Sequence, residues 1–288
     1  MKVARSVDEL EPRPRAAALG TFDGVHRGHR RVLEEALAAG LTATVVTFDP
    51  HPRIALGNRV ELLTTLERRL ELLSELGVEE TLVVEFTLDL ARLEPAEFAD
   101  RVLRAIGTEI VVAGADFRFG RGRSGDLPTL RELGFAVRPV PLVDGVSSSE
   151  IRRLLRAGEV EAAAELLGRP AELDGVVVAG DARGGTLGFP TANLRLEPDL
   201  LVPEFGIYAG AALDHRAAIS IGTNPHYGGE ERRVEAFLLD FDGDLYGRRL
   251  VLELWRRLRD ELAFSNEEEL VGQITRDVEA ARVAERPG

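Results

Sequence analysis

The sequence of 288 residues contains no cysteine, and its only lysine is Lys2, so arginine supplies the other 35 of its 36 basic residues. Without cysteine there are no disulfides, thiolate metal sites, iron–sulfur clusters or cysteine nucleophiles. A lysine this close to the N-terminus does not suit a Schiff-base enzyme or a P-loop, because both need the amine inside a fold. Any phosphate chemistry must therefore use arginine, histidine, backbone N–H groups or a metal ion.

Long apolar runs and an excess of positive charge are also absent. No run approaches the ~20 apolar residues of a membrane-spanning helix, and residues 1–14 lack the apolar centre of a signal peptide. The formal net charge is −13, and neither half of the chain is basic, which argues against nucleic-acid or anionic-membrane partners. We therefore expect a cytoplasmic protein without nucleic-acid or membrane partners. We also expect it to be a monomer or a weak homo-oligomer.

The length suggests two domains of about 150 residues each. Between residues 16 and 150, short apolar runs alternate with helical patterns, which is typical of a parallel sheet covered on both faces. The expected strands are 17–22, 44–48, 81–86, 109–113 and 135–143, and the expected helices are 29–39, 67–76 and 95–106. In such sheets the functional loops follow the carboxyl ends of the strands.

A helical pattern over 150–167, interrupted at Gly158, ends at Gly168-Arg169-Pro170. This stop predicts a boundary between domains 1–168 and 169–288. Closely spaced β-type runs follow and predict a small antiparallel barrel. These runs are 173–179, 206–213, 217–221, 234–240 and 250–253. A final helix is expected over 266–283, with Ser265 as its N-cap and Glu268 completing a capping box.

A glycine-rich segment joins the first predicted strand to the first helix. It reads Gly20-Thr21-Phe22-Asp23-Gly24-Val25-His26-Arg27-Gly28-His29. Glycines let backbone N–H groups approach a ligand, and a helix N-terminus favours anions. His26 and His29 can donate hydrogen bonds to phosphate oxygens and stabilise charge that develops there. The pattern predicts nucleotidyl transfer, in which a substrate phosphate attacks the α-phosphate of a nucleotide and no general base is needed.

Two other interpretations of the histidine pair remain open on the residues alone. The two side chains can serve only to cap or pack the turn. They can also bind zinc, with Asp23, Asp49 or His51 as the third ligand.

H-x-G-H is the signature of the nucleotidylyltransferase superfamily. The glycine-rich segment, together with Thr47-Phe48-Asp49-Pro50-His51-Pro52, resembles the flavin branch of that superfamily, the bacterial bifunctional riboflavin kinase/FMN adenylyltransferases or FAD synthetases. Residues 114–120 are similar to the flavin-side loop of this family, and residues 146–152 to its second nucleotide motif. Serines at a helix N-terminus followed by arginine also suit an anion independently of the family, although an ordinary N-cap has the same pattern.

The resemblance implies a set of site residues in the N-terminal domain. His26 and His29 would be catalytic. ATP would be bound by Gly20, Thr21, Phe22, Gly28, Ser147, Ser148, Ser149 and Arg152, and the flavin by Asp116, Phe117 and Phe119. Ser149 stands where the family usually has threonine, and it keeps the hydroxyl group.

A second glycine-dense loop covers residues 180–193 and contains no lysine, so it is not a Walker motif. Thr191 and Asn193 alternate on an extended segment, so both side-chain oxygens can face one site, and such hard ligands suit Mg²⁺. Glu235 interrupts a hydrophobic run and is either a residue of the barrel rim or a base.

These motifs, with G-I-Y-A at 206–209, G-T-N-P at 222–225 and D-L-Y-G at 244–247, resemble riboflavin kinase, the other half of the same family. The resemblance makes Glu235 the base that accepts the proton of the terminal ribityl hydroxyl of riboflavin. ATP and Mg²⁺ would be bound by Arg183, Gly188, Pro190, Thr191 and Asn193, with Thr191 and Asn193 as metal ligands.

The resemblance covers about residues 16–284 and implies the whole architecture. We expect an N-terminal α/β nucleotidyltransferase-type, Rossmann-like domain with a parallel sheet. A small antiparallel β-barrel riboflavin kinase domain with a terminal helix should follow it. The expected chemistry makes FMN from riboflavin and FAD from FMN, with ATP as co-substrate and Mg²⁺ as cofactor.

Departures from the family pattern keep alternatives open. Gly185 stands where arginine is usual, and His226 where a smaller residue is common, so one alternative is an adenylyltransferase with an impaired kinase half. Another is a flavin- or nucleotide-sensing protein without turnover. On H-x-G-H alone, a cytidylyl- or pantetheine-type transferase is a third.

Three further patterns have less weight. Residues 120–125 match G-x-G-x-x-G, but they do not join a strand directly to a helix, so we expect a Gly/Arg loop rather than a dinucleotide site. Residues 240–244 resemble a calcium loop whose later ligand positions are wrong, and we expect a hairpin turn there. Arg256, Arg257 and Arg259 match an arginine-rich family segment, and we expect at least one of them to be solvated.

Overall fold

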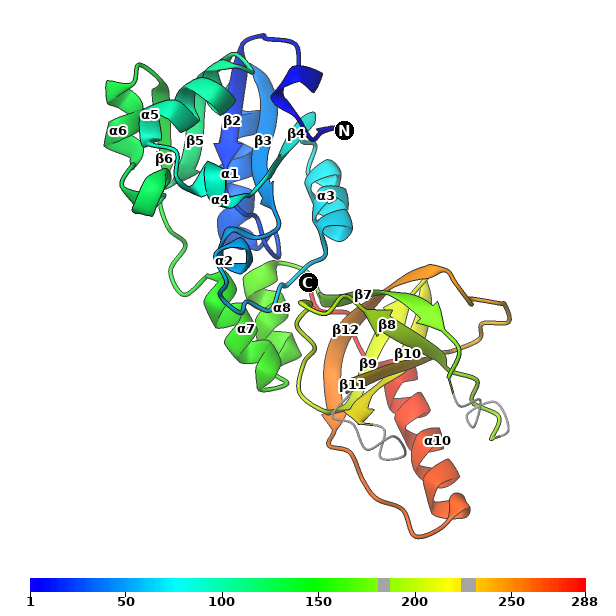
Figure 1. Cartoon of the computed structure of the whole chain (residues 1–288). Coiled ribbons are helices and arrows are strands. Elements are labelled where there is room, and N and C mark those ends of the chain that lie inside the picture. Colours follow the sequence, from blue (N-terminus) through cyan, green and yellow to red (C-terminus); the bar gives the residue numbers. More distant parts are fainter. Residues whose placement is uncertain (181–186, 224–231) are drawn as a thin grey trace. The chain divides into compact units, whose positions relative to one another are not determined.

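The computed structural model describes residues 1–180, 187–223 and 232–288, which form two compact units (Figure 1). The first unit comprises Met1–Val60 and Leu66–Val146, and the second comprises Glu61–Thr65 and Ser147–Gly288. No helix in the described ranges is long and apolar enough to cross a membrane.

Six parallel strands form the sheet of the first unit, in the order β1-β4-β3-β2-β5-β6. They are β1 (Lys2–Ala4), β2 (Arg15–Leu19), β3 (Thr42–Asp49), β4 (Glu80–Glu85), β5 (Thr108–Gly114) and β6 (Ala136–Val140). Successive residues pack into different apolar layers: Ala17 belongs to one core cluster and Ala18 to the other. The predicted parallel sheet with two covered faces is confirmed, and β1 is a strand that the sequence pattern did not predict.

Helices cover both faces of this sheet (Figure 1). The helices of the whole unit are α1 (Arg27–Leu37), α2 (Pro52–Ala55), α3 (Leu66–Glu75), α4 (Leu88–Ala91), α5 (Pro95–Phe98) and α6 (Leu127–Glu132), with shorter or irregular turns η1 (Val7–Glu9), η2 (Ala99–Arg104) and η3 (Arg121–Arg123). Leu33 of α1 and Leu73 of α3 pack on one face, and Leu103 and Leu130 on the other. The helix predicted over 95–106 is α5 continued by η2, which is a π-helix.

The second unit is a closed antiparallel barrel in the order β10-β11-β8-β7-β12-β9. Its strands are β7 (Ala171–Val178), β8 (Ala192–Leu196), β9 (Gly206–Ala212), β10 (His215–Thr223), β11 (Arg232–Leu238) and β12 (Arg249–Arg259). The predicted barrel is confirmed. The hairpin predicted at 240–244 is wrong, because β8 and β7 separate β11 from β12 in the barrel.

Two helices at the start of this unit, α7 (Ser148–Arg156) and α8 (Val160–Leu167), pack with the barrel. The sequence pattern groups them with the first domain, but Ile151, Leu155 and Val160 belong to the apolar cluster of the barrel. Gly158 separates the helices with φ 74°, as the predicted interruption requires. The functional boundary after residue 168 stays a prediction.

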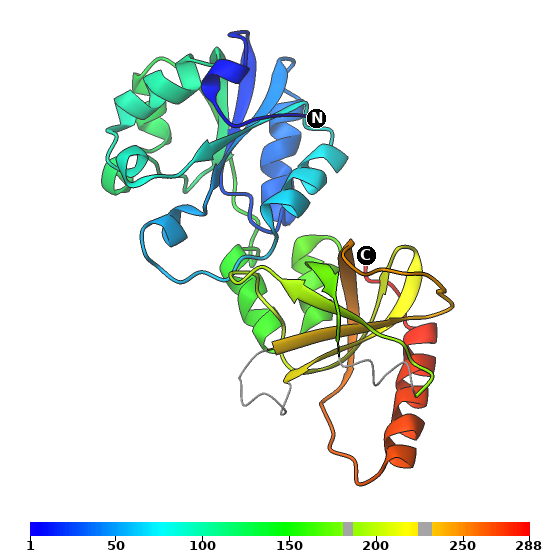
Figure 2. The same cartoon turned by 45° about the vertical axis from the view of Figure 1, so that its right-hand side comes forward.

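The last helix, α10 (Glu267–Val283), lies along the outside of the barrel beside β9 and β10 (Figures 1 and 2). Small residues allow this close packing: Ala209 and Ala281 form one apolar cluster with Trp255. The predicted N-cap Ser265 is wrong by one residue, because the side chain of Asn266 accepts the hydrogen bond from the backbone N–H of Glu269.

Candidate functional site

The glycine-rich segment lies at the topological switch point of the parallel sheet. β2 has β3 on one side and β5 on the other, so the chain runs outward through β3 and β4 and then returns to β5. In α/β sheets, ligands bind beyond the carboxyl ends of the strands at such a reversal. The loop after β2 carries His26 and His29, and the loop after β5 carries Phe117 and Phe119. The fold therefore brings the predicted nucleotide and flavin loops to neighbouring strand ends.

Backbone strain shapes the loop after β2. Phe22 (φ 51°) and Val25 (φ 40°) are buried non-glycine residues with positive φ, and Gly24 lies between them with φ 82°. Such conformations cost about 1–3 kcal/mol each and persist only where the surrounding packing imposes them. Phe22 therefore leaves the strand direction, which is why β2 ends at Leu19 rather than at the predicted residue 22.

The two histidines are stacked at the start of α1. Their ring centroids are 3.6 Å apart with an interplanar angle of 13°. The Nδ1 atom of His26 accepts a hydrogen bond of 3.3 Å from the backbone N–H of His29. This bond assigns the ring proton of a neutral His26 to Nε2, which makes that nitrogen a hydrogen-bond donor. The capping interpretation is confirmed as a structural role, and it is compatible with phosphate binding.

Gly28 makes this arrangement possible. A Cβ atom at position 28 would lie 3.1 Å from Cε1 and 3.2 Å from Nδ1 of His26, closer than ordinary side-chain contacts. The glycine in H-x-G-H therefore provides space for the histidine ring. In the described ranges, no group of three or more His, Asp or Glu side chains is arranged to hold a metal ion.

A buried arginine, which the sequence interpretation missed, holds the loop after β2 by hydrogen bonds to backbone carbonyls. Arg69 of α3 is 1% exposed, and its Nη1 donates to the carbonyls of Thr21 (2.8 Å) and Phe48 (3.3 Å). The hydroxyl of Thr47 donates to the same Thr21 carbonyl at 3.1 Å. These bonds join the loop after β2 to the end of β3. An arginine between the apolar positions 66 and 73 of one helix is a weak signal for such a role.

Aromatic side chains surround the loop after β5. The rings of Phe117 and Phe119 are stacked at 5.9 Å, and Phe119 also contacts Phe98. Phe119 is buried, Phe117 is half-buried and Asp116 is exposed. Gly125 pairs with Phe119 through two backbone hydrogen bonds, and a Cβ atom there would lie 2.7 Å from the Phe119 ring. This glycine of the G-x-G-x-x-G match thus serves packing within a loop, as its context predicts.

The second nucleotide motif belongs to the unit that contains the barrel. Ser147 is the N-cap of α7, and its side chain accepts from the backbone N–H of Glu150 at 3.1 Å. Arg152 is buried, and its Nε donates to the carbonyl of Glu61 at 2.6 Å. Ser148 and Ser149 occupy the first turn of α7. The predicted contact of these residues with ATP phosphates stays a prediction.

Three of the predicted kinase residues, Thr191, Asn193 and Glu235, lie together on the outer face of the barrel. Asn193 of β8 is the registered partner of Glu235 on β11. The hydroxyl of Thr191 donates to Oε2 of Glu235 at 3.3 Å. The neighbours Val234 and Ala236 point into the core, so Glu235 lies outside it. A hydroxyl, an amide oxygen and a carboxylate are the hard donors that Mg²⁺ prefers, so these residues fit that ion.

A pocket of about 260 Å³ adjoins this site at the end of the barrel. Pro190 and Thr191 line it together with Phe241, Leu245 and Tyr246 from the segment after β11. The pocket combines apolar and aromatic walls with a few polar groups, which is typical of small-molecule sites. Gly188 precedes it with φ 86°. Arg183, Gly185 and His226 lie outside the described residues.

The three arginines of the C-terminal segment make separate contacts. Arg256 is exposed at the surface, as expected for at least one of them. The Nη2 atom of Arg257 donates to the carbonyl of Phe205 at 2.6 Å. Arg259 forms a two-point ion pair with Asp277 of α10, with distances of 2.9 and 2.6 Å. At least these last two residues therefore stabilise the unit.

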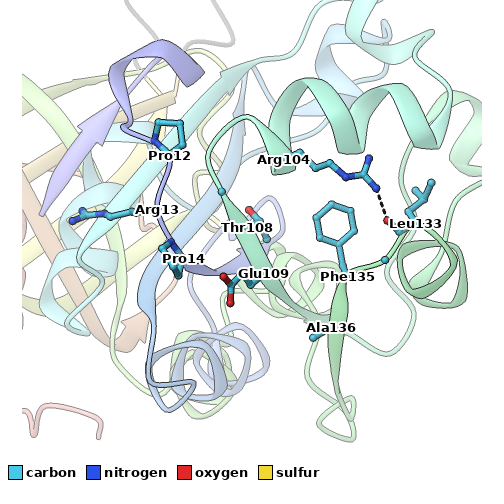
Figure 3. A pocket seen from close by; sticks show the side chains of 11 residues that line it. Pro12, Arg13, Pro14, Arg104, Thr108, Glu109, Leu133, Phe135 and Ala136 are labelled. Carbon is cyan, nitrogen blue, oxygen red and sulfur yellow. Dashed lines mark hydrogen bonds between the residues drawn. The ribbon is translucent and has the colours of Figure 1, made fainter.

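A hollow of about 740 Å³ lies at the amino edge of the parallel sheet, where β5 and β6 begin (Figure 3). Its walls include Pro12, Thr108 and Phe135, and the guanidinium of Arg104 lies 5.1 Å from the centroid of the Phe135 ring. Of the predicted site residues that the structure describes, none lines it. Because ligands of such sheets bind at the carboxyl edge, this hollow is not the candidate active site.

The first unit has an H-x-G-H loop between a strand and a helix at the switch point of its sheet. The second unit is a barrel with Thr, Asn and Glu on one face. This combination is that of a two-domain enzyme of nucleotidyl and phosphoryl transfer. Comparisons with known proteins agree. The FAD synthetase family model matches residues 8–151, and the riboflavin kinase family model matches residues 167–284. The chain belongs to the bifunctional riboflavin kinase/FMN adenylyltransferase family, transferases that form FMN and FAD in flavin cofactor biosynthesis.

Relatives of this family match nearly the whole chain. The bifunctional riboflavin kinase/FMN adenylyltransferase of Listeria monocytogenes is 37% identical, covering 96% of this chain and 94% of the relative. That of Escherichia coli strain K12 is 35% identical, covering 98% and 97%. A crystal structure from Streptococcus pneumoniae, described as a macrolide-efflux protein, has a TM-score of 0.88 and 32% identity, covering 98% and 99% of the two chains. The fold is therefore shared along the chain, and the efflux designation belongs to that protein.

Proposed function

We propose that the barrel unit phosphorylates riboflavin with Glu235 as general base. The observation that carries this proposal is the convergence of Thr191, Asn193 and Glu235 on one face of the barrel, with the hydroxyl of Thr191 3.3 Å from the carboxylate. An alcohol is a weak nucleophile, so a carboxylate that accepts its proton assists the attack. The ribityl oxygen then bonds to the γ-phosphorus of ATP, the bond to the bridging oxygen breaks, and ADP leaves.

Mg²⁺ belongs to the same proposal. Thr191 and Asn193 would hold it beside the ATP phosphates, while Arg183, Gly188 and Pro190 would bind the nucleotide. When bound, the ion would neutralise charge on the phosphate oxygens. Glu235 would remain the acceptor of the hydroxyl proton, and the 260 Å³ pocket next to Thr191 would enclose part of one substrate.

For the sheet unit, we propose that a phosphate oxygen of FMN attacks the α-phosphorus of ATP and that pyrophosphate leaves. This nucleophile is already an anion, so the unit needs no general base. The Nε2–H of His26 and the neighbouring ring of His29 would stabilise charge on the α-phosphate. The loop of Gly20, Thr21, Phe22 and Gly28 would hold ATP, and the ATP-binding role of Ser147, Ser148, Ser149 and Arg152 stays a prediction.

The flavin would bind next to this loop, at the carboxyl end of β5. Phe117 and Phe119 offer a stacked aromatic surface for the isoalloxazine ring, and Asp116 is exposed to accept hydrogen bonds from it. A cytoplasmic location and a monomeric or weakly associated state stay predictions.

Reciprocal variants test this division of labour. Glu235→Ala should abolish the formation of FMN from riboflavin and leave the conversion of supplied FMN to FAD unchanged. His29→Ala should give the opposite pattern. Separation of flavins after incubation with ATP measures both rates in one sample. Loss of both activities in a folded variant would contradict the proposal, and so would FAD formation by His29→Ala at the original rate.

The same assay on the unaltered protein decides the remaining alternatives. FAD made from supplied FMN with no FMN made from riboflavin would mean an impaired kinase half, as the departure at Gly185 suggests. Flavin binding without any turnover would mean a sensing protein.

A further inference from the structure

The carboxylate of Glu235 has a contact at each of its two oxygens. The hydroxyl of Thr191, which precedes β8, donates to Oε2 at 3.3 Å, and Nη1 of Arg233 on β11 lies 3.5 Å from Oε1. Residues 233 and 235 share the outer face of β11, because side chains alternate along a strand and Val234 points into the core. Arg233 and Glu235 each expose 31% of their side chains. The pair is thus open enough to admit a substrate and close enough to interact.

We propose that Arg233 is a positioning residue for phosphoryl transfer and acts through Glu235. This inference rests on the proposed role of Glu235 as base. A base must present a lone pair to the hydroxyl proton in a fixed direction. With Thr191 alone, one carboxylate oxygen would be held and the group could turn about its terminal torsion, which is broad for glutamate. A cation at the other oxygen fixes the plane of the carboxylate.

The two contacts still leave the carboxylate able to accept a proton. An ionised carboxylate has about four lone-pair positions, so each oxygen keeps one after Thr191 and Arg233 have taken theirs. Arg233 cannot accept the hydroxyl proton itself, because a guanidinium has no acceptor atom. Its part in the reaction is therefore orientation of the base and not proton transfer.

The adjacent residue provides a matched control. Arg232 has the same side chain, but its Nη1 donates to the carbonyl of Val202 at 2.7 Å. Its guanidinium carbon lies 5.1 Å from the centroid of the Phe205 ring. Two arginines adjacent in sequence thus have different surroundings, and only the one at 233 contacts Glu235 among their described contacts.

Steady-state kinetics of the full chain test the proposal. We expect Arg233→Gln to lower the kcat of FMN formation by roughly tenfold, since misplacing a catalytic group forfeits part of its effect. The KM values for riboflavin and ATP should stay within about twofold, because the proposal assigns Arg233 to orienting the base and not to substrate binding. Arg233→Lys should recover most of the lost rate because it restores a cation. Arg232→Gln should match the unaltered protein, and FAD formation from supplied FMN shows that each variant is folded.

A double variant separates action through Glu235 from independent action. Glu235→Gln with Arg233→Gln should be no slower than Glu235→Gln alone, because coupled residues are not additive. A further loss as large as that of Arg233→Gln alone would overturn the inference. So would a raised KM with unchanged kcat, or an Arg233→Gln variant of full activity while Glu235→Gln is inactive. Full kinase activity of Glu235→Gln would instead overturn the proposed function.

Discussion

Replacing Glu80 by glutamine should destabilise the first unit, because it removes the carboxylate partner of a buried arginine. Arg15 is 0% exposed and Glu80 is 3% exposed. The Nε atom of Arg15 donates to Oε2 of Glu80 at 2.8 Å, and the hydroxyl of Thr44 donates to the same oxygen at 3.2 Å. Breaking a buried ion pair on one side typically costs 3–5 kcal/mol. Glutamine keeps one acceptor, so we expect roughly 3 kcal/mol.

For a unit of this size, 1 kcal/mol corresponds to about 2–4 °C in Tm, so the expected decrease is roughly 6–12 °C. Heating samples to a series of temperatures and then measuring FAD formation follows the first unit, while FMN formation follows the second. Arg13→Gln is the control, because Arg13 pairs with Glu80 from a side chain that is 50% exposed. Such partly exposed pairs contribute about 0–1 kcal/mol.

The pH dependence of the same pair has a definite sign. Burial alone would raise the pKa of Glu80, but hydrogen bonds and charges from Arg15 and Arg13 outweigh it and hold the pKa below its ordinary value of 4.5. A carboxylate with a lowered folded-state pKa stabilises the fold above its unfolded pKa, and that stability is lost as the pH falls through the folded pKa. The difference in the free energy of unfolding between the unaltered protein and Glu80→Gln should therefore be constant from pH 8 to 5. It should shrink below about pH 4.5. A difference in the free energy of unfolding of less than 1 kcal/mol at pH 7 would refute the reasoning. So would a difference that stays at its pH 7 value down to pH 3.

Two further predictions follow, one for each unit. Gly28→Ala should lower the rate of FAD formation by about tenfold, because its Cβ displaces the His26 ring by a few tenths of an ångström. Its Tm should not fall, since alanine favours a helix, and a normal rate of FAD formation would contradict this account of the glycine. Asp277→Asn should loosen α10 and shift the emission of Trp255, the sole tryptophan, to longer wavelength, because Arg259 loses its two-point partner. Arg282→Gln, which breaks an exposed pair on the same helix, should leave that emission unchanged.

Local patterns predicted the sheet, the barrel and the two glycine-rich loops that contain the candidate site residues. Short apolar runs of four to nine residues and the glycines around His26 and Thr191 are informative because strand burial and turn chemistry are local properties. β1 escaped prediction because three residues show no periodicity. The run of β8 has no clear strand pattern, although the alternation of Thr191 and Asn193 predicts an extended segment, and Asn193 lies in β8.

Features that depend on distant partners could not be predicted in this way. Residues 61–65 join the barrel unit through bonds such as Leu62 N–H to the carbonyl of Asp199 at 2.6 Å, which link positions far apart in sequence. Arg69 lies on the buried face of an amphipathic helix, and the residues next to it in sequence do not indicate which carbonyls it will bond. The positive φ of Phe22 is imposed by packing, because phenylalanine has no local preference for it.

The scarcity of lysine has a physical counterpart inside the first unit. Arg15 and Arg69 are its two largest fully buried side chains, and each bonds carbonyls from separate segments: Arg15 reaches Glu11 and Ile106, and Arg69 reaches Thr21 and Phe48. A guanidinium stays charged when buried and directs donors along several fixed directions, whereas an ammonium is a point charge that readily loses its proton on burial. A chain that uses cations to join segments therefore gains from arginine at those positions. Composition can predict the identity of these cations, but their positions depend on which carbonyls the fold leaves without partners.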